Sequence, residues 1–330
     1  MKNMPFGKLK PRALERLLAG VKPPDGAGVL LGPSLGEDAA VLRVGKRLVV
    51  VATDPVTFVT DEIGHYAVTV NANDIACLGA RPRWLQVCLL LPPMSEKRIK
   101  RLFDSIANSA AAQGIAVTGG HTEITVGLDR PIVVGTMLGE VSLENLVRPS
   151  GARKGDLLLM IKPVAIEGTS ILAREKSREL SRRFGRAFVK RCAGFLHEPG
   201  ISVVRPALAA ARAGAHALHD PTEGGLLTGA YEIARASRVG LLLDADAAQI
   251  LPETRKIADF FSIDPLGLIA SGTLLAAFDE PSARRFLRRA NALGGAWVIG
   301  RFEGKKILVK RDGKIHRLEP SGKDEILKAL

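Results

Sequence analysis

Helix-like and strand-like segments alternate along the whole chain, and this alternation restricts the folds that the chain can form. Apolar runs such as 48–52 and 84–91 are typical of strands, whereas 63–78 and 96–113 carry the apolar spacing of helices. Alternating elements of both kinds predict an α/β (α+β) architecture in which helices cover mixed sheets. Because 330 residues exceed what one hydrophobic core usually contains, we expect two domains.

A segment rich in turn residues separates the two halves. Residues 146–155 contain Pro, Ser, two Gly and three basic residues, and a strand-like run follows at 156–161. We therefore predict an N-terminal domain over residues 1–150 and a C-terminal α/β domain over residues 151–330.

Composition excludes several classes of protein. The chain is 46% hydrophobic and 25% charged, which is typical of a globular protein and excludes a disordered one. The longest nearly apolar stretch, 266–278, is too short to span a bilayer, and the N-terminus lacks the apolar core of a signal peptide. Cys77, Cys88 and Cys192 form no C-x-x-C pair. We expect a cytoplasmic protein with structural thiols and no membrane segment.

The formal net charge of +13 raises nucleic acid, an anionic ligand or an acidic protein as partners. The densest basic run is 174–191, in which Leu180, Phe184 and Phe188 recur at every fourth position. This spacing predicts one amphipathic helix with a core stripe and a solvated basic face. Because no nucleic-acid-binding motif accompanies the run, we favour the solvated face over a nucleic-acid surface.

Short acidic motifs stand where we expect strands to end and helices to begin. Asp54 follows the apolar run 48–52, which we expect to be buried on both faces, and Asp74 interrupts an apolar helix. A carboxylate buried in this way needs a cation or hydrogen-bond donors. The motifs are Gly36-Glu37-Asp38-Ala39-Ala40, Thr53-Asp54-Pro55, Asn73-Asp74, Gly119-Gly120-His121-Thr122-Glu123 and Asp220-Pro221-Thr222-Glu223-Gly224-Gly225.

Carboxylates gathered from separate elements repel one another unless divalent cations lie between them, and oxygen ligands favour Mg²⁺, Mn²⁺ or Ca²⁺. The pairs Gly119-Gly120 and Gly224-Gly225 permit close backbone approach and can expose N–H donors to phosphate oxygens. The chain contains no G-x-x-x-x-G-K-[ST] sequence. Any one motif alone is more often a turn or a helix cap, but the ordered set favours a metal–nucleotide site.

In order and spacing these motifs resemble those of the superfamily of aminoimidazole ribonucleotide (AIR) synthase, selenophosphate synthetase, thiamine-monophosphate kinase and the HypE-type hydrogenase-maturation carbamoyl dehydratase. The resemblance runs from about residue 30 to 305, and the N-D-I-A-C-L-G-A-R-P element at 73–82 is its most specific part. Segments 166–173, 219–226 and 264–266 are most similar to the hydrogenase-maturation branch.

The resemblance implies a PurM-like homodimer whose N-terminal sheets pair, and an enzyme that uses ATP with Mg²⁺ for phosphoryl transfer to an acceptor. It implies that Asp38, Asp54, Asp74 and Glu123 hold the metal or face the phosphates. It also implies a nucleotide site shaped by Asn73, Gly119, Gly120, Thr122, Asp220, Gly224 and Gly225.

The sequence departs from the HypE pattern in two places. The family's carbamoyl dehydratase carries its activated group on a C-terminal cysteine, whereas this chain ends in 324–330 and has its last cysteine at Cys192. G-G-H-T-E also replaces the usual G-D-T-K. We therefore expect a HypE-like enzyme whose unknown acceptor is a separate small molecule or a group on a partner protein. A small-molecule kinase like thiamine-monophosphate kinase and a non-catalytic ATP-binding scaffold are the alternatives.

Two residues are candidates for acid–base catalysis. His121 lies inside a motif, and its alternative role is that of a hydrogen-bonded turn residue. Glu223 extends the D-P-T motif toward the presumed cleft, and its alternative role is that of a helix-capping carboxylate. His216 and His219 are three apart on a predicted strand, so their side chains should point to opposite faces and form no chelating pair.

Overall fold

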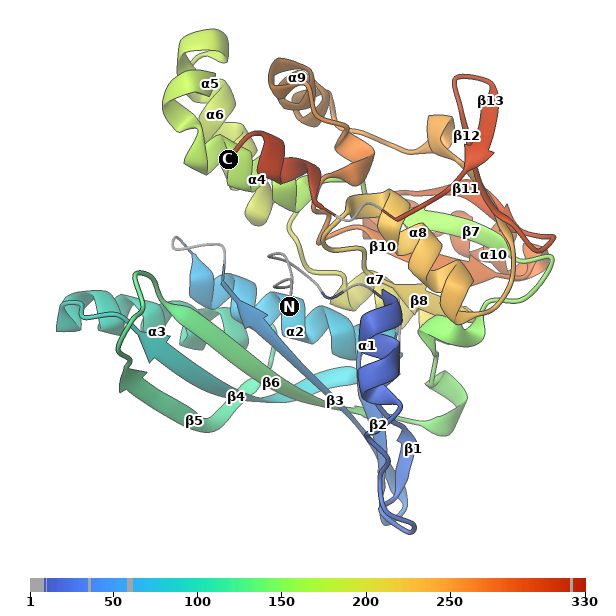
Figure 1. Ribbon diagram of the computed structural model, residues 1–330, viewed down its shortest axis with the longest axis horizontal. Coiled ribbons are helices and arrows are strands. Elements are labelled where there is room, and N and C mark those ends of the chain that lie inside the picture. The colour runs from blue at the N-terminus through green and yellow to red at the C-terminus, as the bar shows by residue number, and fades with distance from the viewer. Residues whose placement is uncertain (1–8, 10, 35–36, 58–61, 321–322) are drawn as a thin grey trace.

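The computed structural model describes residues 9, 11–34, 37–57, 62–320 and 323–330. It contains two mixed sheets, one in each half of the chain, with helices packed on both (Figure 1). The strand order is β1-β2-β3-β6-β4-β5 in the six-stranded sheet and β13-β12-β9-β11-β7-β10-β8 in the seven-stranded sheet. The expected two-domain α/β architecture is confirmed.

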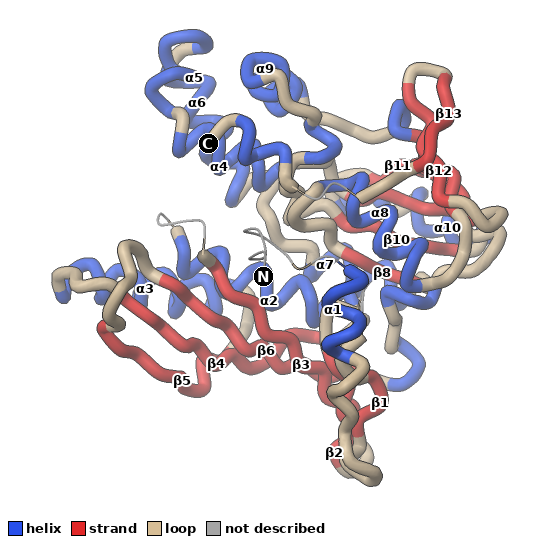
Figure 2. The backbone as a smooth tube through the Cα atoms, in the orientation of Figure 1, coloured by secondary structure: helices blue, strands red, loops and turns tan. Residues whose placement is uncertain are grey.

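Helices α2 and α3 pack together on one face of the N-terminal sheet (Figure 2). Most neighbouring strands are antiparallel, whereas β4 and β5 are parallel because α3 connects them. The elements are α1 (Pro11–Leu18), β1 (Val29–Leu31), β2 (Ala40–Val44), β3 (Arg47–Val56), α2 (Ile63–Cys77), β4 (Arg81–Leu91), α3 (Glu96–Ala112), β5 (Ala116–Ile124) and β6 (Ile132–Val141).

The side chains of β3 alternate between the two faces of this sheet. Leu48, Val50 and Ala52 are buried on the face that α2 covers, whereas Val49 and Val51 are only half-buried on the open face. The expectation that this run is buried on both faces is therefore wrong for a single chain. Because residues 48–52 are apolar on both faces of β3, the open face presents apolar side chains that no other described part of the chain fully covers.

The C-terminal sheet is built around β7, whose five residues are all buried between β10 and β11. The elements of this domain are β7 (Leu157–Ile161), α4 (Ile166–Glu175), α5 (Ser177–Phe184), α6 (Arg186–Ala193), α7 (Val204–Arg212), β8 (Ala217–His219), α8 (Gly225–Ala236), β9 (Leu241–Asp244), α9 (Pro252–Phe261), β10 (Leu274–Phe278), α10 (Glu280–Leu287), β11 (Ala296–Phe302), β12 (Ile307–Arg311) and β13 (Lys314–Arg317).

The basic segment forms two short helices, α5 and α6, and not the single amphipathic helix expected from its spacing. The break falls at Gly185, whose φ of 87° ends α5. Leu180, Phe188 and Cys192 are nevertheless buried, as the apolar stripe predicts. A fourfold apolar spacing is compatible with two packed helices as well as with one, and the glycine decides between them.

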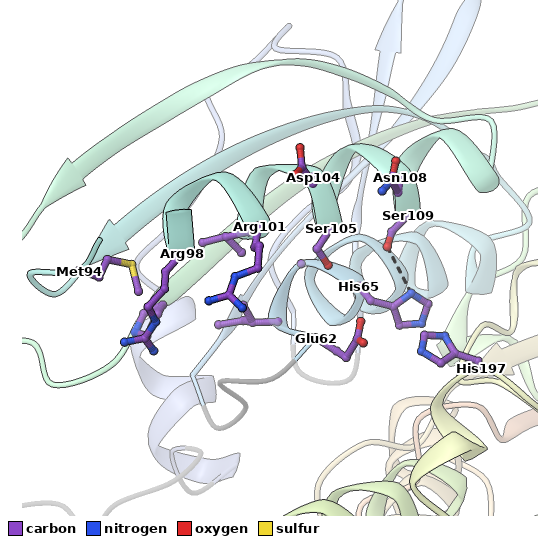
Figure 3. A pocket seen from close by; sticks show the side chains of 14 residues that line it. Glu62, His65, Met94, Arg98, Arg101, Asp104, Ser105, Asn108, Ser109 and His197 are labelled. Atoms are coloured by element: carbon purple, nitrogen blue, oxygen red, sulfur yellow. Dashed lines mark hydrogen bonds between the residues drawn. The ribbon is translucent and has the colours of Figure 1, made fainter. Parts of the chain in front are cut away.

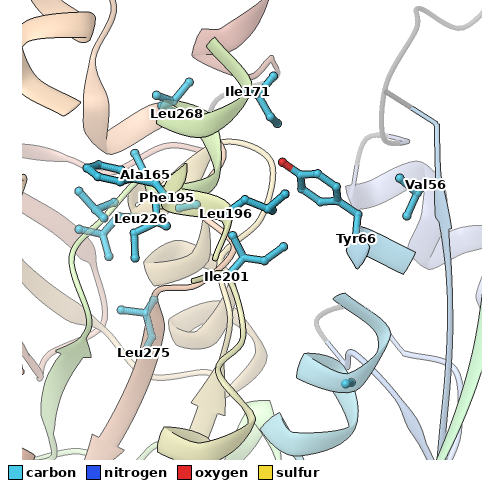
Figure 4. Close-up of a cluster of buried hydrophobic side chains, with 14 of the residues drawn as sticks. Val56, Tyr66, Ala165, Ile171, Phe195, Leu196, Ile201, Leu226, Leu268 and Leu275 are labelled. Atoms are coloured by element: carbon cyan, nitrogen blue, oxygen red, sulfur yellow. The ribbon is translucent and has the colours of Figure 1, made fainter. Parts of the chain in front are cut away.

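Buried apolar side chains of the two domains pack together at the domain junction. Val56 and Tyr66 of the first domain face Ile171, Leu196 and Ile201 of the second (Figure 4). None of the helices in the described residues combines the length and apolar character needed to cross a membrane.

Segment 200–203 is fastened from both domains. Asn73 of α2 donates from Nδ2 to the Ile201 carbonyl at 2.9 Å and accepts from the Val203 N–H at 2.8 Å. From the other side, the Lys162 ammonium donates to the carbonyls of Gly200 and Ser202. Burial lowers the pKa of Lys162 to about 8, which still leaves most of its ammonium charged at neutral pH. Segment 200–203 is therefore held by hydrogen bonds from side chains of both domains.

Candidate functional site

Asp54 and Asp74 are brought together by the packing of α2 on β3. Asp54 lies near the end of β3, on the face that α2 covers, and its N–H donates to Asn71 Oδ1 at 3.0 Å. Gly135 of β6 leaves room for this contact, because a Cβ there would lie 2.5 Å from Asn71 Nδ2. Asp74 follows within the same helix, is 6% exposed and shares a hydrogen bond with Asp54.

Asp38, which precedes β2, and Asp220, which follows β8, complete a cluster of four carboxylates from both domains. Burial, followed by the charges of Asp54, Asp220 and Asp38, raises the pKa of Asp74 well above its ordinary value. Burial and Asp38 likewise raise the pKa of Asp220 to about 7. A cation among these side chains would offset both the burial and the repulsion.

The two oxygen atoms of Asp220 have different surroundings. Oδ1 accepts from the Cys77 thiol at 3.4 Å, whereas Oδ2 is buried with no hydrogen-bond partner in the described part of the chain. Burial and the surrounding carboxylates raise the pKa of Cys77 well above its ordinary value, so the sulfur stays a protonated donor. The oxygen ligands left are those that Mg²⁺ prefers.

The four carboxylates are close to one another but are not yet arranged as metal ligands. Within the described ranges, no three His, Cys, Asp or Glu side chains surround one point at which a metal ion could be held. Cation binding would therefore require these side chains to turn toward a common centre.

His219 fixes the position of Asp38 across the domain junction. Its Nδ1 lies 2.8 Å from Asp38 Oδ2 and its Nε2 lies 3.1 Å from Glu232 Oε2. Burial alone would lower the pKa of His219, but the two carboxylates outweigh burial and raise it well above the ordinary value. The charged imidazole thus donates to both. His216 contacts Asp156 instead, at 2.9 Å, so the two histidines form no chelating pair, as expected.

Gly224 and Gly225 begin α8, as the sequence indicates. Both have positive φ, 81° and 62°, and a Cβ on Gly225 would lie 2.6 Å from the carbonyl oxygens of Leu266 and Leu268. Only glycine fits this position. The expected N–H donors are not available to phosphate in this structure, because the Gly224 N–H donates to Asp324 and the Gly225 N–H donates to the Thr222 carbonyl.

Asp324 is a site residue that the sequence does not reveal. Its carboxylate accepts from the N–H groups of Gly224, Ile269 and Ile326, at 2.6, 3.2 and 2.8 Å. The only sequence signal is its position as a cap of the short turn 325–328. That signal does not show that the end of the chain returns to α8.

Glu167 of α4 lies close to Asp324 and Glu223, near the start of α8. It is 4% exposed, and its Oε2 accepts from the Ser271 N–H at 3.0 Å. Burial, with added repulsion from Glu223 and Asp324, raises the pKa of Glu167 to about 7. Glu223, the predicted acid or base, is half-buried beside it. The start of α8 is therefore acidic, with one carboxyl that titrates near neutrality.

Gly119 and Gly120 lie inside the edge strand β5, and not at the end of a strand as expected. A Cβ on Gly120 would lie 1.8 Å from the Val87 carbonyl oxygen, so glycine is needed for β5 to pair with β4 at this position. His121 Nε2 lies 3.2 Å from Glu123 Oε2 on this exposed strand. The hydrogen bonds from Thr125 and His121 lower the pKa of Glu123. Thr122 lies between them and is exposed.

Strand register separates this motif from the carboxylate cluster. Asp54 pairs with Gly135, Gly135 with Val87, and Val87 with Gly120, so three strand spacings intervene, roughly 14 Å. Of the predicted metal residues, the structure brings Asp38, Asp54 and Asp74 together and leaves Glu123 on the edge strand. Of the predicted nucleotide residues, Asp220 joins the cluster, and the Asn73 amide binds segment 200–203 instead.

Comparison with known proteins matches both halves of the chain to one family. Residues 36–141 match the AIR synthase related protein N-terminal domain, and residues 153–311 match the corresponding C-terminal domain. Carbamoyl dehydratase HypE of Cupriavidus necator is 30% identical over 253 residues, which are 73% of this chain and 68% of that protein. The chain belongs to the AIR synthase-related family.

A second HypE sequence and two solved structures are also similar to this chain. Carbamoyl dehydratase HypE of Rhodobacter capsulatus is 29% identical over 275 residues, which cover 80% of this chain and 78% of that protein. A solved HypE in complex with ATP superposes with a TM-score of 0.70 at 23% identity, covering 96% of this chain and 97% of that one. A chain in a solved HypE–HypF complex superposes with a TM-score of 0.72 at 21% identity, covering 86% of this chain and 93% of that one.

These similarities confirm the AIR synthase-related, PurM-like fold, and they confirm that the chain is HypE-like. The solved structures share the fold at low sequence identity. The family relationship therefore rests on the matched domains and the HypE sequences.

Proposed function

We propose that this chain is a HypE-like enzyme that uses Mg²⁺ and ATP to activate an oxygen atom of an acceptor by phosphoryl transfer. The observation that carries the proposal is the cluster of Asp38, Asp54, Asp74 and Asp220 from both domains, in which a buried oxygen of Asp220 has no donor among the described residues. Four aspartates in one place, with Asp74 and Asp220 buried, are costly unless a cation binds among them. The relationship to HypE, one structure of which contains ATP, supports the same nucleotide.

Each junction residue then has a defined task. The four aspartates would hold Mg²⁺, which when bound neutralises charge on the phosphates during transfer. His219 holds Asp38 in place, and Cys77 donates to Oδ1 of Asp220, which would leave Oδ2 available as a ligand for the metal. The proposal replaces the predicted Glu123 with Asp220, because Glu123 lies on β5.

Glu223 remains the proposed acid–base residue on the acceptor side. It lies on the short segment between Asp220 and α8, so it is carried close to the carboxylate cluster by the chain itself. His121 is not part of this catalytic set, because its ring contacts Glu123 on the exposed edge strand. We place the protein in the cytoplasm, where ATP and Mg²⁺ are available and its three free cysteines stay reduced.

Calorimetric titration with ATP should show binding in Mg²⁺ and a loss of binding in EDTA. The carboxylate cluster repels the phosphates of free ATP, so the nucleotide needs the cation at this site. If ATP binds equally well in EDTA, the carboxylates are not its metal site and the proposal is wrong. Binding in Mg²⁺ without ADP release in the presence of candidate acceptors would instead support an ATP-binding scaffold.

The acceptor class is decided by where phosphate or the activated group goes. A relative occurs in a HypE–HypF complex, which supports a group on a partner protein as the acceptor here. Incubation with [γ-³²P]ATP and candidate acceptors separates the alternatives. A stable phosphorylated small molecule identifies a kinase like thiamine-monophosphate kinase, whereas ADP and inorganic phosphate with a modified protein identify a HypE-like activation.

We also propose that the open face of the N-terminal sheet forms a homodimer. Outward side chains on β3, β6 and β4 are mostly apolar and only half-buried, including Val51, Leu138 and Trp84, which are neighbours in the strand register. Strand β5 leaves an exposed edge beside them. Such a face is suited to a self-complementary interface around a twofold axis.

Leu138→Lys should convert the dimer to a monomer, because it places a charge in the middle of this face. Light scattering with size exclusion should give about twice 35.2 kDa for the wild type and 35.2 kDa for the variant. Ile315→Lys is the control, since Ile315 is 56% exposed on β13 of the other domain. A monomeric wild type, or a Leu138→Lys variant that stays dimeric, would contradict this interface.

A further inference from the structure

A groove with both polar and apolar lining residues lies between α2, α3 and the segment after α6, away from the carboxylate cluster. A cavity of about 670 Å³ occupies it, and its lining residues are drawn in Figure 3. A second cavity of about 350 Å³ continues toward segment 200–202. The two cavities share His65, Asn108, Ser109 and His197. We call this feature the α2–α3 groove, defined by His65, Arg98, Arg101, Ser105, Ser109 and His197.

Two arginines mark one end of the α2–α3 groove. Arg98 and Arg101 are almost one turn apart on α3, line the larger cavity and form no ion pair within the described chain. The carboxylates on this lining are Glu62 and Asp104, and Asp104 is already held by Lys100 at 2.7 Å. Positive charge therefore exceeds negative charge where the guanidinium groups lie, and both guanidinium groups have donors to spare.

Two imidazoles mark the other end of the groove. The rings of His65 and His197 meet edge to face, with centroids 4.8 Å apart, and Ser109 Oγ lies 3.3 Å from His65 Nδ1. His65 Nε2 is buried and makes no hydrogen bond to the described residues. Burial, followed by the charge of His197, lowers the pKa of His65 to about 4. This ring is thus neutral at pH 7 and lies beside the lining of both cavities.

The α2–α3 groove is distinct from the proposed metal site. His65 lies in the first turn of α2 and Asp74 lies nine residues later, about 13 Å along the helix axis. Nine residues also rotate the helix by about half a turn, so the two side chains point to opposite sides of α2. A ligand in the groove would touch neither the aspartates nor Cys77.

We propose that the α2–α3 groove is a second binding site, for a small ligand that carries a phosphate group. The phosphate would face Arg98 and Arg101, whose guanidinium groups bind phosphate oxygens in a fork geometry. The remainder of the ligand would lie along Ser105 and Ser109 toward the two imidazoles. The volume of the cavity is within the range of small-molecule sites.

The test uses the full chain in EDTA without nucleotide, with inorganic phosphate as the probe and the imidazole NMR signals of His65 and His197 as the readout. Phosphate should shift both signals in a saturable way at low ionic strength. Arg98→Gln/Arg101→Gln should weaken the apparent affinity by about tenfold or more, because two charge-assisted contacts are lost. Glu62→Gln should strengthen it, because a carboxylate is removed from the lining.

Lys97→Gln is the matched control, since it removes one positive charge from the same helix outside the groove. Asp74→Asn should bind phosphate as the wild type does, which separates this site from the metal–nucleotide site. Saturable shifts lost only in the double arginine variant support the proposal. Absent shifts, or equal weakening by Lys97→Gln and by the arginine substitutions, would show non-specific attraction to a basic protein and overturn it.

Discussion

Asp74→Asn should abolish measurable Mg²⁺–ATP binding and at the same time make the nucleotide-free protein more stable. Asp74 is buried next to three other aspartates, so its carboxyl group is an unfavourable element of the folded chain when no cation is bound. Asparagine keeps the shape and removes the charge. We expect a gain of about 1–2 kcal/mol in the free energy of unfolding at pH 7.5 without metal, as is common when a functional site is neutralised.

Two measurements check this prediction on the same samples. Calorimetry should show at least a hundredfold loss in affinity for ATP with Mg²⁺, and thermal unfolding in EDTA should show a higher midpoint for the variant. Added Mg²⁺ and ATP should raise the midpoint of the wild type only. Asp129→Asn is the control, because the Asp129 side chain is 94% exposed. A variant that is less stable than the wild type and still binds ATP would show that Asp74 is structural.

Glu167→Gln should remove a large part of the pH dependence of stability. Burial raises the pKa of Glu167 from 4.5 to about 7 in the folded chain. Its contribution to stability is therefore complete below pH 4.5, decreases as the pH rises, and is lost once the pH passes about 7. A shift of this size corresponds to about 3 kcal/mol. Glutamine keeps the acceptor for the Ser271 N–H and does not ionise.

Chemical denaturation from pH 4.5 to 8 measures this effect as the difference between variant and wild type. The variant should gain stability relative to the wild type as the pH rises, with most of the gain reached by pH 7 to 8. Glu175→Gln, on the exposed side of the same helix α4, should leave the wild-type pH profile unchanged. A constant difference across the pH range would mean that Glu167 does not titrate there.

The sequence predicts the parts of the site that depend on local pattern. Helix α2 and its buried Asp74, strand β3 with Asp54 near its end, and the start of α8 at Gly225 all follow from apolar spacing and glycine positions. The family resemblance adds their common purpose. That Asp38, Asp54 and Asp74 lie close together was expected from this resemblance.

The parts that the sequence does not predict depend on pairing between distant segments. Whether Glu123 reaches the other acidic residues is decided by the strand order, which puts β6 and β4 between β3 and β5. The contact of Asp324 with Gly224 joins residues 100 positions apart. The α2–α3 groove needs His197 of the second domain beside His65 of the first. No local pattern specifies such juxtapositions.

Asn73 and Asp74 are neighbours in sequence with different tasks, since Asn73 binds segment 200–203 and Asp74 lies in the carboxylate cluster. A rotation of the second domain would therefore pull on α2 and change the separation between Asp74 and Asp220. Metal affinity would then depend on the angle between the domains, even though no ligand is replaced. An acceptor that reorients the second domain on binding would, by this linkage, also change the affinity for the proposed Mg²⁺ and ATP.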